Sequence, residues 1–211
     1  MITFDLSLYL VTDRTLCHNH SFETVVKEAV EGGVTMVQLR EKHASSKEFY
    51  EIAIRIKKIL HPYNVPLIIN DRLDIAIACD AEGLHIGQSD LPYEVARKIL
   101  GKEKIIGLSV ENMQDAINAN DLDVDYIGLS PVFGTPTKTD TALPLGLEGV
   151  RKITEISKHP TVGIGGLNLH NAREVIDAGA NGISVVSAIM SAENPRSAVS
   201  ELIDIIKKKQ I

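Results

Sequence analysis

Basic and amide side chains follow a short apolar segment in the sequence VQLREK. If that segment is a strand, its two-residue period turns Gln38, Arg40 and Lys42 toward one side. Leu39 and Glu41 then face the opposite side. Cations on an inner face are costly unless an anion neutralises them. The pattern therefore predicts an anion-binding site. The alternative is that Lys42 is merely solvated beyond the strand end, with a triplet that points outward or into solvent.

Two aspartates lie just beyond later apolar segments, in IIND and GLHIGQSD. If these segments are neighbouring parallel strands, Asn70, Asp71 and Asp90 meet at the same end of the sheet. Carboxylates repel a polyphosphate unless a cation lies between them, and few protein oxygens combined with phosphate oxygens is the ligand pattern of Mg²⁺. Asp71 and Asp90 are therefore candidate Mg²⁺ ligands. The alternatives are simple ion pairs, or a helix N-cap role for Asp71.

Glycines and small residues close two further apolar segments, in VGIGGLN and SVVSAI. Gly165 and Gly166 allow the backbone to approach a ligand closely, and the amides of Val186 and Ser187 lead into a short helical turn. We expect a second anion site here. Glycines that serve only a tight turn are the alternative.

The segment GTPTKTDT is rich in hydrogen-bond donors and follows an apolar run. A buried strand is expected to turn quickly, whereas this segment spends four threonines, one lysine and one aspartate before the next element. We interpret it as a loop that holds a substrate, with Lys138 as a mobile cation.

Other residues with reactive side chains favour ordinary structural roles. His85, in GLHIG, is more typical of a hydrogen-bonded strand histidine than of a catalyst or metal ligand. Cys17 and Cys79 lack metal-ligand spacing and are expected to be free thiols. The sequence contains no Ser-His-Asp pattern and no metal-binding histidine spacing.

These residues are positioned by short apolar segments that alternate with segments of helical periodicity. The expected strands are Ser7–Val11, Thr35–Leu39, Pro66–Ile69, Gly83–Ile86, Ile105–Ser109, Tyr126–Leu129, Thr161–Ile164 and Gly182–Val186. The expected helices are Glu23–Glu31, Lys47–Leu60, Arg72–Ala78, Tyr93–Leu100, Asn112–Ala119, Leu147–Ser157, Asn171–Ala178 and Pro195–Lys209. Eight strand-then-helix units without a linker predict one (β/α)8 barrel domain over residues 1–211, with functional residues on the loops after the strands. A doubly wound open sheet is the alternative, although no G-x-G-x-x-G follows the first strand.

Composition and charge exclude several classes of function. Of 211 residues, 44% are hydrophobic and 24% are charged, as is usual for a globular protein. A net charge of −6, the absence of Trp and an aromatic content of 4% argue against a nucleic-acid groove. The first residues lack a basic region before a long apolar run, and no apolar stretch approaches the length of a membrane span. We expect a cytoplasmic protein that acts on small molecules, binds neither nucleic acid nor membrane, and is compatible with a homo-oligomer.

The chain resembles the thiamine-phosphate synthase (thiamine-phosphate pyrophosphorylase) family in order and over nearly its whole length. The matching blocks are YLVTD, VQLREK, LIINDRLDIA, GLHIGQSDLP, IGLSV, PVFGTPTKTDTALPLGL, VGIGGL and GISVVSAI. Each block alone is unspecific, and together they make a strong resemblance. One departure is Ser130, where the family more often has glycine before Pro-Val-Phe.

The resemblance implies roles for individual residues. The residues implied to bind a pyrimidine diphosphate are Gln38, Leu39, Arg40, Glu41, Lys42, Asn70, Ser109 and Lys138. Those implied to bind a thiazole phosphate are Thr135, Pro136, Thr137, Gly166, Val186 and Ser187. Asp71 and Asp90 are implied to bind Mg²⁺, with one ion per active site. The implied catalytic residues are Arg40, Lys42, Ser109 and Lys138.

The resemblance also implies the reaction. A transferase of this family joins hydroxymethylpyrimidine diphosphate to a thiazole phosphate, with or without a carboxylate, and yields thiamine phosphate and pyrophosphate. Cations would neutralise the departing diphosphate, and the pyrimidine amino group would stabilise a carbocation-like centre, so that no side-chain nucleophile is required. The alternatives are a thiazole tautomerase of the same superfamily and a non-catalytic phosphate-ligand binder. Neither of them needs the residues implied for diphosphate and metal.

Overall fold

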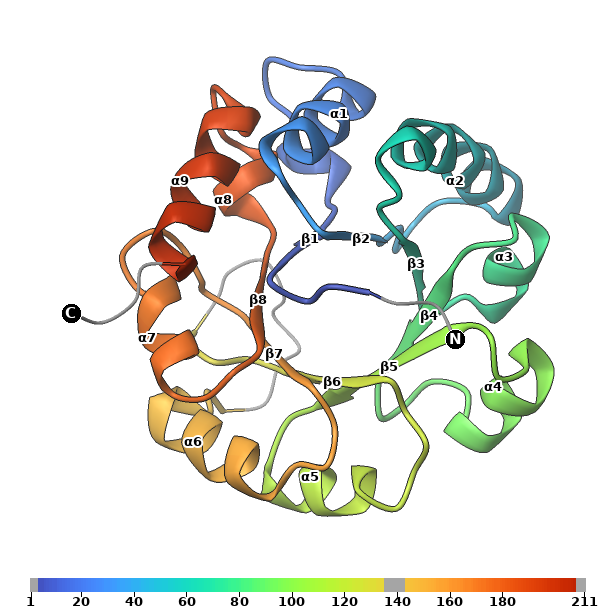
Figure 1. Cartoon of the computed structure of the whole chain (residues 1–211). Helices are drawn as coiled ribbons and strands as arrows, with labels where there is room; N and C mark the ends of the chain where they lie inside the picture. Colours follow the sequence, from blue (N-terminus) through green and yellow to red (C-terminus); the bar gives the residue numbers. More distant parts are fainter. Residues whose placement is uncertain (1–3, 135–142, 208–211) are drawn as a thin grey trace.

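The computed structural model describes residues 4–134 and 143–207. Its strands form a closed parallel barrel in the order β1 to β8, and β8 pairs back onto β1. Figure 1 shows this ring of strands with the helices outside it. The predicted (β/α)8 barrel is confirmed, and the doubly wound alternative is wrong because the sheet has closed. The strands are β1 (Leu8–Val11), β2 (Met36–Leu39), β3 (Leu67–Asn70), β4 (Gly83–Ile86), β5 (Ile105–Val110), β6 (Tyr126–Leu129), β7 (Thr161–Ile164) and β8 (Gly182–Val185).

The helices agree with the expected ranges to within one or two residues at most ends. Side chains of Ser21, Ser45 and Asn112 accept hydrogen bonds from backbone amides at three helix starts, and Gly33 ends the first helix in the left-handed region with φ 111°. Residues 208 and 209 of the last expected helix lie outside the described residues. The helices are α1 (Phe22–Gly32), α2 (Ser46–Leu60), α3 (Leu73–Ala78), α4 (Tyr93–Leu100), α5 (Met113–Ala119), α6 (Gly146–Ile156), α7 (Ala172–Asp177), α8 (Ser187–Met190) and α9 (Pro195–Lys207), with 3₁₀ turns η1 (Arg14–Leu16) and η2 (His61–Tyr63).

The alternation of side chains along the strands divides the interior into two hydrophobic clusters. The larger one lies between the strands and the surrounding helices. The smaller one fills the barrel itself, and it includes Leu6, Tyr9, Met36, Ile68, Ile105, Tyr126 and Val162. Figure 1 shows the segment before β1 crossing the centre of the ring of strands. There Phe4 packs against the ring of Tyr126, with ring centroids 6.1 Å apart, so this segment closes one end of the barrel.

The two cysteines and the short helix α8 are placed as the sequence indicates. Cys17 and Cys79 are free thiols, as expected, and burial raises the pKa of both. In the described part of the chain, no helix is both long enough and apolar enough to cross a membrane. The short helix α8 follows β8 directly, where the sequence indicates a helical turn.

Candidate active site

A cavity of about 790 Å³ opens where the carboxyl ends of the strands meet. All eight strands contribute to its lining or to the loops that rim it, as expected for a barrel of this kind. The lining includes Tyr9, Thr12, Gln38, Arg40, Lys42, Asn70, Asp71, His85, Asp90, Ser109, Gly128, Gly166, Ser184, Val186 and Ser187. Residues far apart in the sequence are therefore brought to one site.

The basic triplet after β2 faces this cavity. Gln38, Arg40 and Lys42 all line it, which is the orientation that the two-residue period predicts. The outward-facing alternative is wrong. Gln38 is only 4% exposed, whereas the two cations lie nearer the rim. The barrel therefore carries positive charge at its mouth rather than in its apolar interior.

Leu39 and Glu41 are placed differently from the triplet. Leu39 is fully buried in the cluster between strands and helices. The carboxylate of Glu41 forms a bidentate ion pair with Arg14, through Nε at 2.9 Å and Nη2 at 2.8 Å. Neither residue is part of the described cavity lining, so their implied contacts with the pyrimidine diphosphate stay predictions.

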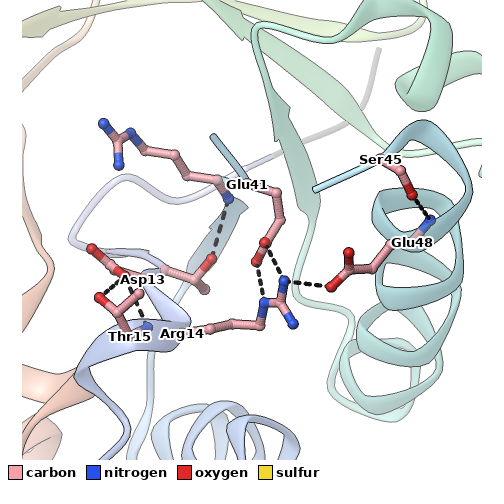
Figure 2. A network of polar contacts seen from close by, with 8 residues as sticks. Asp13, Arg14, Thr15, Glu41, Ser45 and Glu48 are labelled. Atoms are coloured by element: carbon pink, nitrogen blue, oxygen red, sulfur yellow. Dashed lines mark hydrogen bonds and ion pairs between the residues drawn. The ribbon is translucent and has the colours of Figure 1, made fainter. Parts of the chain in front are cut away.

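Arg14 connects three elements beside the triplet. Figure 2 shows its guanidinium between Glu41, at the end of β2, and Glu48 of α2, to which Nη2 also donates at 2.9 Å. The hydrogen bonding of the Arg14 guanidinium to the Glu41 carboxylate is the main reason that the pKa of Arg14 is raised. The neighbouring Thr12 hydroxyl accepts from the backbone amide of Arg40 at 3.2 Å. These contacts fix the backbone from which Arg40 and Lys42 extend.

Asp71 and Asp90 lie together at the rim. Asp71 Oδ2 is 3.1 Å from Nζ of Lys42, and Asp90 Oδ2 accepts from the amide of Gly87 at 2.7 Å. Burial raises the pKa of Asp90, and the neighbouring Asp71 carboxylate raises it further. The expected proximity of the two carboxylates is thus observed. The alternative of Asp71 as an N-cap is wrong, because Arg72 occupies the N-cap position of α3 and makes no side-chain capping bond.

His85 is part of a buried chain of hydrogen bonds. Its Nδ1 lies 2.9 Å from the hydroxyl of Tyr126, and its Nε2 lies 2.9 Å from Oγ of Ser109. The expectation of a hydrogen-bonded strand histidine is confirmed. However, His85 also lines the cavity next to Asn70 and Ser109, which sequence reasoning missed. The two-residue period of GLHIG was the available signal, because Leu84 and Ile86 flank the histidine and face the opposite side of the strand.

The glycine loop after β7 is held by side-chain amides. Gly165 and Gly166 have φ values of 103° and 67°, a region that other residues enter with strain. Asn171 Nδ2 donates to the carbonyl oxygen of Gly166 at 2.9 Å, and Asn171 Oδ1 accepts from the amide of Asn168 at 2.9 Å. This loop and the start of α8 at Ser187 both line the cavity. Backbone amides at a helix start have no acceptor within the helix, and they can bind an anion.

Part of the predicted site lies outside the described residues. It consists of the loop residues Thr135, Pro136, Thr137 and Lys138.

Fold and site together define a (β/α)8 barrel with basic side chains, carboxylates and a glycine loop around one cavity at its mouth, where enzymes of this fold carry their active sites. The family described as thiamine monophosphate synthase matches residues 8–189. The chain belongs to this family, and it is a transferase of thiamine biosynthesis.

Individual relatives agree with this assignment. The chain is 53% identical over 199 residues to a thiamine-phosphate synthase of Leptospira biflexa, covering 92% of this chain and 95% of that protein. It is 49% identical over 201 residues to a thiamine-phosphate synthase of Albidiferax ferrireducens, covering 95% and 92%. The solved structure of a thiamine phosphate pyrophosphorylase from Pyrococcus furiosus superposes with a TM-score of 0.87 at 42% identity, covering 96% of each chain.

Proposed function

We propose that the chain condenses 4-amino-2-methyl-5-hydroxymethylpyrimidine diphosphate with a thiazole phosphate in the cavity at the barrel mouth. The thiazole nitrogen forms a bond to the pyrimidine methylene carbon, and the bond from that carbon to the diphosphate oxygen breaks. Pyrophosphate leaves with the electron pair, and thiamine phosphate is the other product. A carboxylate on the thiazole, where present, leaves as CO₂. The step needs no oxidant or reductant.

One observation carries this proposal. The cations Arg40 and Lys42 and the carboxylates of Asp71 and Asp90 line the same cavity as the glycine loop at Gly165–Gly166. The first group suits a diphosphate, and the second suits a phosphate monoester. A cavity with two such regions accommodates two phosphorylated substrates at once.

At the first region, we assign the diphosphate to Arg40 and Lys42. Negative charge grows on the diphosphate as it departs, so fixed cations near it stabilise the transition state more than the ground state. We assign the pyrimidine ring to Gln38, Asn70 and Ser109, which line the cavity wall below the rim. Lys138 is proposed from the sequence as a third cation.

We assign Mg²⁺ to the carboxylates at the rim. Within the described residues no group of three or more histidine, cysteine, aspartate or glutamate side chains gathers to hold a metal, so Asp71 and Asp90 would act as a pair. Two carboxylates with room for water and phosphate oxygens fit Mg²⁺, which binds few protein ligands. When bound there, Mg²⁺ supplies charge neutralisation for the diphosphate. Lys42 is paired with Asp71 and helps to orient that carboxylate.

At the second region, we assign the thiazole phosphate to the amides of Gly166, Val186 and Ser187. Asn171 holds the Gly166 loop in place through its carbonyl oxygen. We further propose Thr135, Pro136 and Thr137 as contacts to the same phosphate, on the sequence alone. In this proposal the thiazole nitrogen and the pyrimidine methylene share one cavity, and exclusion of water would protect a carbocation-like centre from hydrolysis.

A direct assay tests the proposal. Purified protein is incubated with both substrates and Mg²⁺, and pyrophosphate and thiamine phosphate are measured. We expect both products in equal amounts, and neither when one substrate is omitted or Mg²⁺ is chelated. A rearranged thiazole without pyrophosphate would indicate a tautomerase instead. Ligand binding without any product would indicate a phosphate-ligand binder.

A further inference from the structure

A continuous chain of hydrogen bonds crosses the barrel along the cavity, and it is buried except at its part-buried end at Ser109. It begins at Gln38 on β2, whose Nε2 donates to the hydroxyl of Tyr9 on β1 at 2.9 Å. The hydroxyls of Tyr9 and Tyr126 are 2.9 Å apart. The chain continues from Tyr126 on β6 to Nδ1 of His85 and from Nε2 of His85 to Oγ of Ser109, each at 2.9 Å. Four contacts thus connect one wall of the cavity to the other through side chains of five strands.

The number of protons on each group determines which group donates in every hydrogen bond of this chain. Each phenol has one proton, and burial raises the pKa of both Tyr9 and Tyr126, so both remain protonated. Tyr9 accepts from Gln38, and therefore its own proton goes to Tyr126. The proton of Tyr126 then goes to Nδ1 of His85. A neutral histidine that accepts at Nδ1 carries its proton on Nε2, and it donates that proton to Ser109.

The backbone makes room for this chain at two glycines. A Cβ atom at Gly107 would clash with the ring and hydroxyl of Tyr126. Tyr126 is the cross-strand partner of Gly107 in the register of β5 and β6. A Cβ atom at Gly128 would lie 3.3 Å from Cε1 of His85. The rings of His85 and Tyr126 lie 5.6 Å apart at an angle of 30°. The histidine ring is therefore confined on two sides, and its orientation follows from Tyr126.

We propose that Tyr9 and Tyr126 are positioning residues that hold His85 as the Nε2–H tautomer and so make the Ser109 hydroxyl a hydrogen-bond donor toward the substrate. Ser109 accepts from His85, which leaves its own proton for an acceptor in the cavity, such as a nitrogen of the pyrimidine ring. This assignment rests on the proposed function, because it takes the pyrimidine substrate as the partner of Ser109. Tyr126 is fully buried and does not line the cavity, whereas Tyr9 reaches the cavity wall and donates its proton to Tyr126. Both phenols act through His85.

The tautomer is measured first, on the wild-type protein without substrate. Long-range ¹H–¹⁵N correlation spectra of ¹⁵N-labelled protein report the protonated nitrogen of each histidine, and a His85→Gln variant identifies the signals of His85. We expect the Nε2–H tautomer. A protonated Nδ1 would mean that the chain runs in the opposite direction, and it would overturn the proposal. Because this measurement needs no activity, it is independent of the proposed reaction.

Kinetics of Tyr126→Phe then test the role. We expect kcat/KM for the pyrimidine diphosphate to fall roughly tenfold, the effect of losing one hydrogen bond in a low-dielectric site. In a Ser109→Ala background the same substitution should have no further effect, because Tyr126 acts through Ser109. Tyr93→Phe is the matched control. The Tyr93 side chain is also buried, its hydroxyl donates to the carbonyl oxygen of Asp123, and it lies outside the cavity lining.

The outcomes separate a positioning role from a structural one. If Tyr126→Phe only lowers the melting temperature, or lowers kcat/KM equally with and without Ser109, the proposal is overturned. If the variant does not fold, the wild-type tautomer still decides the direction of the chain. Absence of thiamine phosphate from the wild-type assay would contradict the proposed function, while the tautomer result would stand on its own.

Discussion

Nζ of Lys42 lies 3.1 Å from Oδ2 of Asp71, so a cation that we assign to the diphosphate pairs with a carboxylate that we assign to Mg²⁺. The pair joins the end of β2 to the end of β3 at the rim of the cavity. Charge at this point is therefore balanced within the protein, and a substitution of either residue changes the charge at the positions that we assign to the diphosphate and to Mg²⁺.

Asp71→Asn and Asp90→Asn should each lower turnover by about 100-fold, because each removes a carboxylate that we assign to Mg²⁺. We expect the Mg²⁺ concentration needed for half-maximal rate to rise in both variants, while the melting temperature stays close to that of the wild type. Asp80→Asn is the control, since Asp80 lies outside the cavity lining and pairs with Lys57 and Lys104. Unchanged Mg²⁺ dependence in both variants would remove the metal assignment.

Glu41→Gln should raise KM for the pyrimidine diphosphate several-fold with little change in the rate at saturation. The Glu41 side chain is 7% exposed and holds Arg14 by two hydrogen bonds, so its loss loosens the backbone that carries Arg40 and Lys42. We expect a loss of about 1–3 kcal/mol in the free energy of unfolding. Glu48→Gln removes a half-exposed partner of the same guanidinium, and it should change both quantities much less. Equal effects of Glu41→Gln and Glu48→Gln would contradict the proposal that Glu41 holds this backbone in place.

Ser184→Ala should leave the free energy of unfolding unchanged or raise it slightly. Ser184 Oγ is the buried side-chain atom that lacks a hydrogen-bond partner among the described residues, and removing an unsatisfied group costs little. Because Ser184 lines the cavity, we expect KM for either the pyrimidine diphosphate or the thiazole phosphate to rise several-fold. Denaturant unfolding and steady-state kinetics are compared on the same preparation. A clear loss of stability with unchanged KM would indicate a structural role instead.

Gly166→Ala should raise KM for the thiazole phosphate more than KM for the pyrimidine diphosphate. The residue has φ 67°, and an added Cβ would lie 2.8 Å from the carbonyl oxygen of Gly134 and 2.9 Å from Cβ of Phe133. The loop must shift, and strain of about 1–3 kcal/mol is expected. Gly101→Ala is the matched control, because Gly101 has φ 75° with no atom within 4 Å of an added Cβ. The opposite substrate selectivity would mean that the two anion regions are assigned in reverse.

Asp80→Asn should remove a small stability that depends on pH. Hydrogen bonds from Lys104 and then Lys57 lower the pKa of Asp80. Because the folded pKa is below the unfolded value of about 3.9, the contribution is fully present above that value and is lost as pH falls through the folded pKa. The side chain is 79% exposed, so solvent screening limits the difference to below about 1 kcal/mol. Urea unfolding of both proteins, from neutral to acidic pH, should show the difference disappearing. A stability difference between the two proteins that grows in acid would contradict a lowered pKa of Asp80.

Local patterns in the sequence were sufficient for the strands, the helices and much of the site. The two-residue period in VQLREK correctly placed Gln38, Arg40 and Lys42 on the cavity side. The ends of β3 and β4 brought Asp71 and Asp90 together, because adjacent parallel strands end at the same rim. These features depend on the direction of a side chain along its own strand and on which strands are neighbours. Both are encoded over short stretches of chain.

The contacts across the barrel were decided by the tertiary structure alone. The hydroxyls of Tyr9 and Tyr126 meet across a separation of 117 residues, and the position of Arg14 against Glu41 depends on how the loop after β1 lies on the loop after β2. Such pairings depend on the stagger between strands once the sheet has closed, and on which small residues leave space, as Gly107 does for Tyr126. A closed barrel sets these distances for all strands at once, so no single segment of the sequence contains them.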